Sequence, residues 1–339
     1  MDTRIFEIRR GQNDQDLEEA AAILRGGGLV AFPTETVYGL GVSAGNLESV
    51  KQVFQAKGRS FFNPMAFHLP AFEMVTPYVK SVPEEAQALA RKFLPGPLML
   101  LLEKAENVPD LITAGSRKVG VRVPRNSLAS ALFRKAEVPV VATSANVSGR
   151  FSPTTVAHVI DELGGIIDAI VTGSDEEVLG IESTIIDVTT SPFRLTRSGF
   201  ITHEQITKVL GYAPMLSDDD RFSKADKISR DMKIILVEGE SEKVLRRMKT
   251  LIANLPQGSQ VGLLITENSA AHIGNEPCTR VMGPRGNLEV IAKNFFSCLR
   301  SFEKENTKVV LVEGISREGI GWALMERLER MASEVIKVE

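Results

Sequence analysis

The sequence predicts an α/β protein: a first domain with a twisted, mixed sheet, followed by a smaller Rossmann-like domain with a parallel sheet. Apolar strand-like runs alternate with amphipathic segments along the chain, and 339 residues are too many for one ordinary core. A polar, charge-rich stretch at 215–232 interrupts the alternation. We therefore expect a first domain over 1–211, a linker over 212–232 and a second domain over 233–339.

The first part of the chain alternates helices and strands. Residues 14–28 carry apolar side chains on one helical face and end at three glycines, which predicts a helix. The apolar run at 29–32, closed by a proline, predicts a strand, and Asn46 is expected to cap a helix ending near residue 56. A helix is then expected at 83–94, with strands at 64–69, 98–103, 119–124 and 140–145.

Beyond residue 150 the expected elements are mostly strands. A helix is expected over 154–163 and another over 203–211, with strands near 167–172, 182–189 and 193–197. Since strands outnumber helices after residue 95, several must be neighbours without a helical crossover, which favours a mixed sheet.

The second domain contains two nearly identical strand patterns, KIILVEG (233–239) and KVVLVEG (308–314). Both are typical of buried parallel strands that lead through a glycine turn to a helix. Further strands are expected at 261–266 and 335–338, with helices at 241–254, 287–305 and 319–332. This alternation predicts a small doubly wound domain.

Composition excludes several classes of protein. Forty basic and forty-three acidic residues provide no overall positive field for holding a long nucleic acid. Two cysteines exclude a disulfide scaffold, and four histidines without paired spacing argue against a metal site built by protein side chains. No run is apolar enough to span a membrane and the N-terminus is charged, so we expect a cytoplasmic location. Walker, GxGxxG and GxSxG motifs are absent.

Two polar clusters follow expected elements. The first, PTETVYGLG (33–41), comes directly after a strand, so its hydroxyls and amides either bind a small polar ligand or satisfy their own backbone. The second is Lys57-Gly58-Arg59 with Asn63, at a helix C-terminus. Its cations either complement the helix dipole or clamp a triphosphate.

Other polar residues stand on or after expected strands. In VGVRVP, alternation places Arg122 opposite the valines, where it either faces solvent or is buried and needs an anion such as a substrate carboxylate. His68 is either a core residue or a donor to a ligand. ATSANVSG (142–149) and SPTT (152–155) form either an ordinary helix cap or a phosphate-binding segment. Ser144 has no nearby base, which favours a binding role over a nucleophilic one.

Taken together, these motifs resemble the YrdC-like family of threonylcarbamoyl-AMP synthases. The resemblance rests on FPTETVYGLG, KGRSFFNPMAFHL, PGPLMLLLE, VGVRVP, ATSANVSGRFSPTT, GIESTIIDVT and LTRSGFIT, in this order over about 15–205. The second domain, with LVEG and GIGWALMERLERMA, is similar to the C-terminal domain of the long form of that family.

The resemblance implies a nucleotidyltransferase that makes threonylcarbamoyl-adenylate and pyrophosphate from L-threonine, bicarbonate or CO2, and ATP, with Mg2+ accompanying the nucleotide. It implies downstream proteins that transfer the threonylcarbamoyl group to tRNA, and leaves direct tRNA contact open. Lys57 and Arg59 would be the main catalytic charges. The ATP-binding residues it implies are Lys57, Arg59, Asn63, Ser144, Asn146, Ser152 and Arg197. The threonine-binding residues it implies are Thr34, Thr36, His68, Arg122 and Ser183, with Arg122 on the carboxylate.

Four departures from the family pattern keep two alternatives open. KGRP is KGRS here (Ser60), RPG is RSG (Ser198) and PGPLTL is PGPLML (Met99). The linker FSKADKISRDMKI lacks the tyrosine, histidine and proline of the family's motif, which in that family folds over the active site. The alternatives are a related carbamoyl-adenylate-forming enzyme with another acceptor, and a non-catalytic RNA-binding module.

Overall fold

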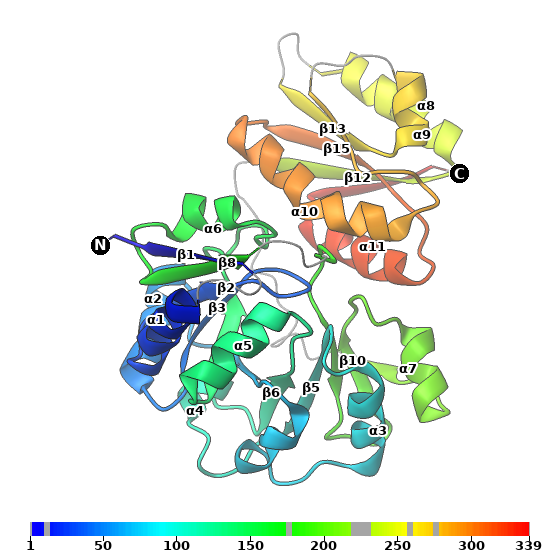
Figure 1. Cartoon of the computed structure of the whole chain (residues 1–339). Helices are drawn as coiled ribbons and strands as arrows, with labels where there is room; N and C mark the ends of the chain where they lie inside the picture. The colour runs from blue at the N-terminus through cyan, green and yellow to red at the C-terminus, as the bar shows by residue number, and fades with distance from the viewer. Residues whose placement is uncertain are drawn as a thin grey trace. The chain divides into compact units, whose positions relative to one another are not determined.

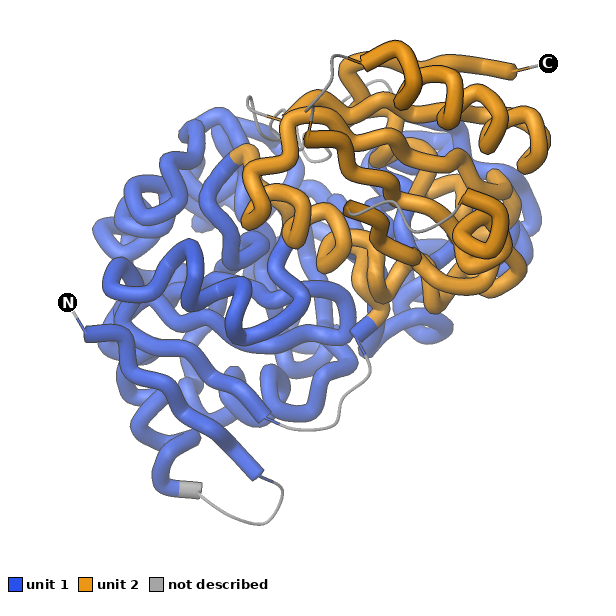
Figure 2. Tube along the Cα trace, turned by 90° about the horizontal axis from the view of Figure 1, so that it is seen from above, with its two compact units in different colours: residues 1–148, 152–178, 182–224 blue, residues 149–151, 179–181, 225–339 orange. Residues whose placement is uncertain are grey.

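The computed structural model describes residues 2–9, 14–173, 178–217, 232–255, 260–273 and 278–338 (Figure 1). The chain divides into two compact units, drawn in two colours in Figure 2. The first unit comprises 1–148, 152–178 and 182–224, and the second comprises 149–151, 179–181 and 225–339. Most of the expected linker, 218–231, lies outside the described residues.

The first unit is built on a mixed sheet, as the sequence predicts. In the described part of the chain it has eleven strands in the order β1-β8-β2-β3-β7-β4-β6-β5-β9-β10-β11, with both parallel and antiparallel neighbours. The strands are β1 (Arg4–Ile8), β2 (Val30–Phe32), β3 (Gly39–Ser43), β4 (Ala66–His68), β5 (Leu98–Glu103), β6 (Lys118–Arg122), β7 (Val140–Ser144), β8 (Ala169–Gly173), β9 (Thr184–Asp187), β10 (Arg194–Arg197) and β11 (Met215–Leu216).

Apolar side chains cover both faces of this sheet. Along β7, Val141 belongs to one buried cluster while Val140 and Ala142 belong to another, because successive strand residues point to opposite faces. Helices α1 and α5 pack on the second of these faces. The helices of this unit are α1 (Asp14–Arg25), α2 (Leu47–Lys57), α3 (Glu84–Phe93), α4 (Asp110–Thr113), α5 (Ser127–Ala136), α6 (Val156–Leu163) and α7 (His203–Leu210), and a 3-10 helix covers Phe72–Tyr78.

The structure also contains elements that the sequence interpretation did not include. Residues 39–43, at the end of the PTETVYGLG cluster and beyond it, form the strand β3, antiparallel to β2. A Cβ at Gly39 would approach the Phe32 ring to 2.7 Å, so this close strand pairing requires glycine. The edge strand β1 and the helix α5 are further additions. Asn46 caps α2 as expected, its side chain accepting from the Ser49 N–H.

The second unit has a parallel sheet, also as predicted. Its five described strands run in the order β14-β13-β15-β12-β16. The two near-copies, β12 (Lys233–Gly239) and β15 (Val309–Glu313), are direct parallel neighbours. The other strands are β13 (Val261–Ile265), β14 (Thr279–Val281) and β16 (Glu334–Val338), and the helices are α8 (Ser241–Ala253), α9 (Glu267–Ile273), α10 (Leu288–Lys304) and α11 (Ile320–Met331).

Helices lie on both faces of this parallel sheet. In Figure 1, α8 and α9 lie on one face, and α10 and α11 lie on the other. Val244 and Met248 of α8 pack on Val237 and Leu311 of the sheet. Among the described residues, none of the helices combines the length and apolar character needed to cross a membrane.

Candidate functional site

The loop between β2 and β3 is held in place by backbone hydrogen bonds to two other segments. The Tyr38 N–H donates to the Pro153 carbonyl at 2.8 Å, and the Tyr38 carbonyl accepts from the Ala145 N–H at 2.9 Å. The threonine cluster and the segment after β7, which the sequence separates by about a hundred residues, are therefore neighbours.

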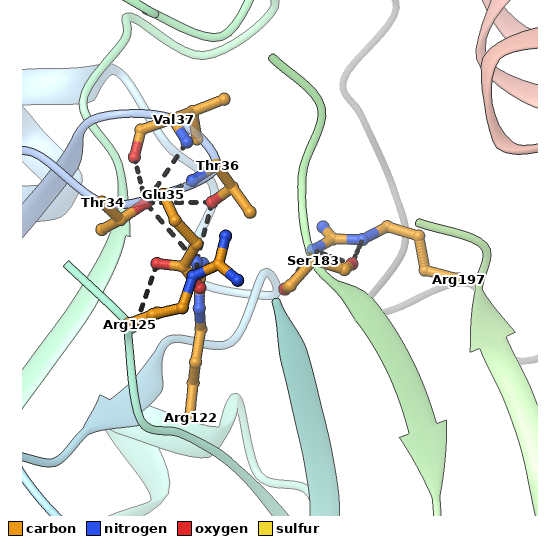
Figure 3. Close-up of polar contacts among 8 residues, drawn as sticks. All are labelled: Thr34, Glu35, Thr36, Val37, Arg122, Arg125, Ser183 and Arg197. Carbon is orange, nitrogen blue, oxygen red and sulfur yellow. Dashed lines mark hydrogen bonds and ion pairs between the residues drawn. The ribbon is translucent and has the colours of Figure 1, made fainter. Parts of the chain in front are cut away.

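Within this loop, Thr34 and Thr36 bond both to their own backbone and to Arg122 (Figure 3). The Thr34 hydroxyl donates to the Val37 carbonyl at 2.6 Å and accepts from the Thr36 N–H at 3.2 Å. Arg122 Nη2 donates to Thr36 Oγ1 at 2.8 Å and to Thr34 Oγ1 at 3.4 Å. The Thr34 hydroxyl thus satisfies the backbone of its own loop, as one of the two interpretations predicts, and ligand binding by this cluster stays a prediction.

Arg122 is buried, with 5% of its surface exposed, and it has a carboxylate partner within the protein. Its Nη2 lies 3.0 Å from Glu35 Oε1, and the Glu35 side chain is also buried. Glu35 Oε2 accepts from the Arg125 N–H at 3.2 Å. The solvent-facing interpretation of Arg122 is wrong. Sequence reasoning missed Glu35, although its position between the two threonines of the cluster was the available signal.

His68 lies beside Arg122, because β4 and β6 are parallel neighbours with these two residues in register. Burial and the positive charge of Arg122 lower the pKa of His68 to about 3, so its imidazole is neutral at physiological pH. Nδ1 lies 3.1 Å from the Ala66 carbonyl, which only accepts, so this nitrogen carries the proton. The remaining ring nitrogen, Nε2, is then a hydrogen-bond acceptor.

Lys57 connects the end of α2 to the end of β7 and the segment that follows it. It is 1% exposed, and its ammonium donates to the carbonyls of Ser144 and Asn146. Its own carbonyl accepts from the Ser148 N–H at 2.8 Å. Gly58 caps the helix in the left-handed conformation, with φ 57°. The structure thus brings together three of the residues expected to bind ATP.

The Arg59 side chain donates hydrogen bonds to the backbone of the loop that follows it. Its Nε donates to the Asn63 carbonyl at 3.2 Å, and its Nη2 donates to the Pro64 carbonyl at 2.9 Å. Asn63 is buried. These bonds hold the turn from Arg59 to Pro64, immediately after the buried lysine.

The last group joins residues that were expected to bind two different ligands. Arg197, expected at ATP, donates from Nε and Nη2 to the carbonyl of Ser183, expected at threonine. The residue before Ser183 is Glu182, whose carboxylate accepts from the Ser152 hydroxyl at 2.7 Å. Glu182 is a second carboxylate that sequence reasoning did not select.

Cationic and hydroxyl side chains predominate among the residues described above. Over the described ranges, no group of three or more histidine, cysteine, aspartate or glutamate side chains is placed to hold a metal ion. Cationic and hydroxyl groups are the chemistry that phosphates and carboxylates require.

Comparisons with known proteins match both units. A family model for Sua5, YciO and YrdC, described as "Telomere recombination", matches residues 22–199. A second model, described as "Threonylcarbamoyl-AMP synthase, C-terminal domain", matches residues 201–333.

Similar proteins cover nearly the whole chain. The chain is 38% identical to a threonylcarbamoyl-AMP synthase of Pyrococcus abyssi, over 99% of this chain and 100% of the relative. It is 37% identical to one from Bacillus subtilis, over 94% of each. A crystal structure of P. abyssi Sua5 complexed with L-threonine matches with 36% identity and a TM-score of 0.92, over 99% of this chain and 100% of that one.

Proposed function

This chain belongs to the threonylcarbamoyl-AMP synthase family in its long, two-domain form, and we propose that it acts as a nucleotidyltransferase through the residues described above. Its function is the synthesis of threonylcarbamoyl-AMP for tRNA modification. In the proposed reaction, the threonine amine loses a proton and adds to CO2 to form a carbamate. A carbamate oxygen then attacks the α-phosphorus of ATP, the bond to the bridging oxygen breaks, and pyrophosphate leaves.

The observation that carries the threonine assignment is the buried position of Arg122. A guanidinium with two threonine hydroxyls and a neutral histidine beside it is suited to a carboxylate, because hydrogen bonds between an arginine and a carboxylate are charge-assisted. Thr34, Thr36, His68 and Ser183 would complete this site. The match to a relative with L-threonine bound supports the assignment.

The assignment of ATP rests on the groups around Lys57 and Arg197. Lys57, Arg59 and Arg197 bring three positive charges to the ends of α2 and β10. These charges would stabilise the negative charge that develops as pyrophosphate leaves, and catalysis would consist of orientation and charge stabilisation. Ser144, Asn146, Ser152 and Asn63 would supply the remaining polar contacts.

Mg2+ would arrive with the nucleotide. The described residues offer no cluster of carboxylates to bind it, and Mg2+ readily takes phosphate oxygens and water as ligands. We assign it the role of neutralising phosphate charge and assign no protein ligand to it. We further propose that the reaction is cytoplasmic and that separate proteins transfer the threonylcarbamoyl group to tRNA.

ATP–pyrophosphate exchange tests the proposal. Exchange should require both L-threonine and bicarbonate, and omission of either should abolish it. Exchange supported equally by serine or another amine would instead identify an enzyme with a different acceptor. Salt-sensitive tRNA binding without any pyrophosphate release would identify an RNA-binding module.

A further inference from the structure

Two buried polar atoms beside each other lack hydrogen-bond partners within the part of the chain that the structure describes. They are Glu35 Oε1, an acceptor, and Arg122 Nε, a donor. Glu35 is 2% exposed and Arg122 is 5% exposed. Buried polar groups in native proteins are nearly always paired, so a vacant acceptor next to a vacant donor requires an explanation.

The hydrogen bonds of the two residues show why these atoms are left over. Glu35 uses Oε2 for the Arg125 N–H, and Arg122 uses Nη2 for the hydroxyls of Thr34 and Thr36. Glu35 Oε1 is 3.0 Å from Arg122 Nη2, close enough for charge attraction, but it accepts no hydrogen bond from it. Figure 3 shows the two side chains meeting beneath the loop.

The vacant pair has the hydrogen-bonding complement of an α-amino acid. In such a molecule the ammonium nitrogen and the carboxyl carbon are only about 2.5 Å apart, so its two charged groups match an acceptor and a donor that are close together. Its ammonium donates and needs an acceptor such as Glu35 Oε1. Its carboxylate accepts and needs a donor such as Arg122 Nε.

We propose that Glu35 binds the α-ammonium group of threonine while Arg122 binds the carboxylate. This inference rests on the proposed function, because it assumes that Arg122 belongs to the threonine site. Glu35 then makes the site selective for amino acids over simple carboxylic acids. It also holds the nitrogen that becomes the carbamate in a fixed place beside the guanidinium.

The test compares the affinities of L-threonine and 3-hydroxybutyrate, which keeps the carboxylate and hydroxyl but lacks the amine. Titration calorimetry should show that the wild-type protein binds threonine more tightly than 3-hydroxybutyrate. Glu35→Gln should weaken threonine binding roughly 10- to 100-fold, the value of a charge-assisted hydrogen bond, and leave 3-hydroxybutyrate binding unchanged or stronger. Glu35→Asp, which keeps the charge, should retain part of the preference.

The outcomes separate this inference from the proposed function. If Glu35→Gln weakens both ligands by the same factor, Glu35 is merely structural and the inference is wrong. Equal binding of the two ligands to wild type overturns it without any variant, even if Glu35→Gln does not fold. If Arg122→Gln binds threonine as wild type does, the proposed threonine site itself fails, and the inference fails with it.

Discussion

Three hydrogen bonds join Arg197, the last residue of β10, to Ser183, the residue before β9. Arg197 Nε and Nη2 lie 3.0 and 2.9 Å from the Ser183 carbonyl, and Nη2 is 3.1 Å from the Ser183 hydroxyl. The fork of the guanidinium fixes its plane in a way that a single ammonium cannot. This contact orients one of the positive charges that we assign to ATP.

We therefore expect Arg197→Lys to reduce the activity of the enzyme although the positive charge is kept. We expect kcat/KM for ATP to fall about 10²-fold, because lysine keeps the charge but loses the fork. Steady-state pyrophosphate release measures this effect. The matched control is Arg194→Lys on the same strand, whose side chain is exposed and which should keep wild-type rates. Wild-type kinetics in Arg197→Lys would show that the reaction does not depend on the forked hydrogen bonds of the guanidinium.

Lys57→Met should abolish most turnover. The substitution preserves length but removes the charge and the hydrogen bonds to the Ser144 and Asn146 carbonyls, so we expect kcat to fall by about 10²- to 10³-fold. Lys51→Met is the control, because Lys51 lies on the same helix with an exposed side chain paired to Glu48. If both variants retain full activity, Lys57 is only a structural cap.

His68 should make the stability of the protein depend on pH. Its pKa is about 3 in the folded protein, against an ordinary histidine value of 6.5 in the unfolded chain. Between these two values the unfolded chain binds a proton that the folded chain does not. The free energy of unfolding therefore falls as the pH falls from 6.5 towards 3, by at most about 1.4 kcal/mol per pH unit from this group.

Denaturant unfolding of wild type and His68→Gln at pH 7 and pH 5 measures this dependence. Wild type should lose up to about 2 kcal/mol more than the variant over this interval. His272→Gln, at an exposed histidine of α9, should keep the wild-type dependence. Identical losses in wild type and His68→Gln would contradict the assignment of a neutral, buried His68.

We expect the buried side chain of Glu313 to stabilise the second unit. Its carboxylate is fully buried and accepts from the Thr266 N–H at 2.8 Å, from the Ser269 hydroxyl at 2.7 Å and from Arg285. Glu313→Gln should lower the free energy of unfolding by about 2–3 kcal/mol. The neutral amide leaves the positive charge of Arg285 without its negative partner, and the amide NH2 faces a group that donated to the carboxylate. Hydrogen exchange of β13 and β15 amides in the full chain measures this loss.

The exposed pair of Glu334 with Lys233 provides the control for that experiment. Glu334→Gln should change stability by no more than about 0.5 kcal/mol, since solvent screens an exposed ion pair. Equal protection of β13 in Glu313→Gln and wild type would show that the buried network is not needed for stability.

Local patterns were sufficient for most of the elements. The strand 98–103 and the strand 233–239 have the predicted bounds, because each is an apolar run between clear turn signals. The helix α5 was missed although its pattern was present: Asn126 caps it, and Ala129, Leu132, Phe133 and Ala136 lie on its buried face. The edge strand β1 has one buried residue, Phe6, and its sequence alone has little strand signal.

The residues of the candidate site were harder to predict from the sequence than the helices and strands. Types of side chain and their place relative to strands indicated Arg122, Thr34 and Thr36, and the structure brings these three together. The carboxylate of Glu35 was missed, because a glutamate in a polar loop has no sequence mark that distinguishes a buried position from an exposed one.

The sequence by itself determined that Arg122 lies opposite the valines of its strand, because side chains alternate along a β-strand whatever the rest of the chain does. Only the tertiary structure decided that this side is buried and that Glu35 is its partner there. The reason is physical: alternation is a property of neighbouring residues, whereas burial and charge pairing depend on which distant segments the sheet order brings beside the strand.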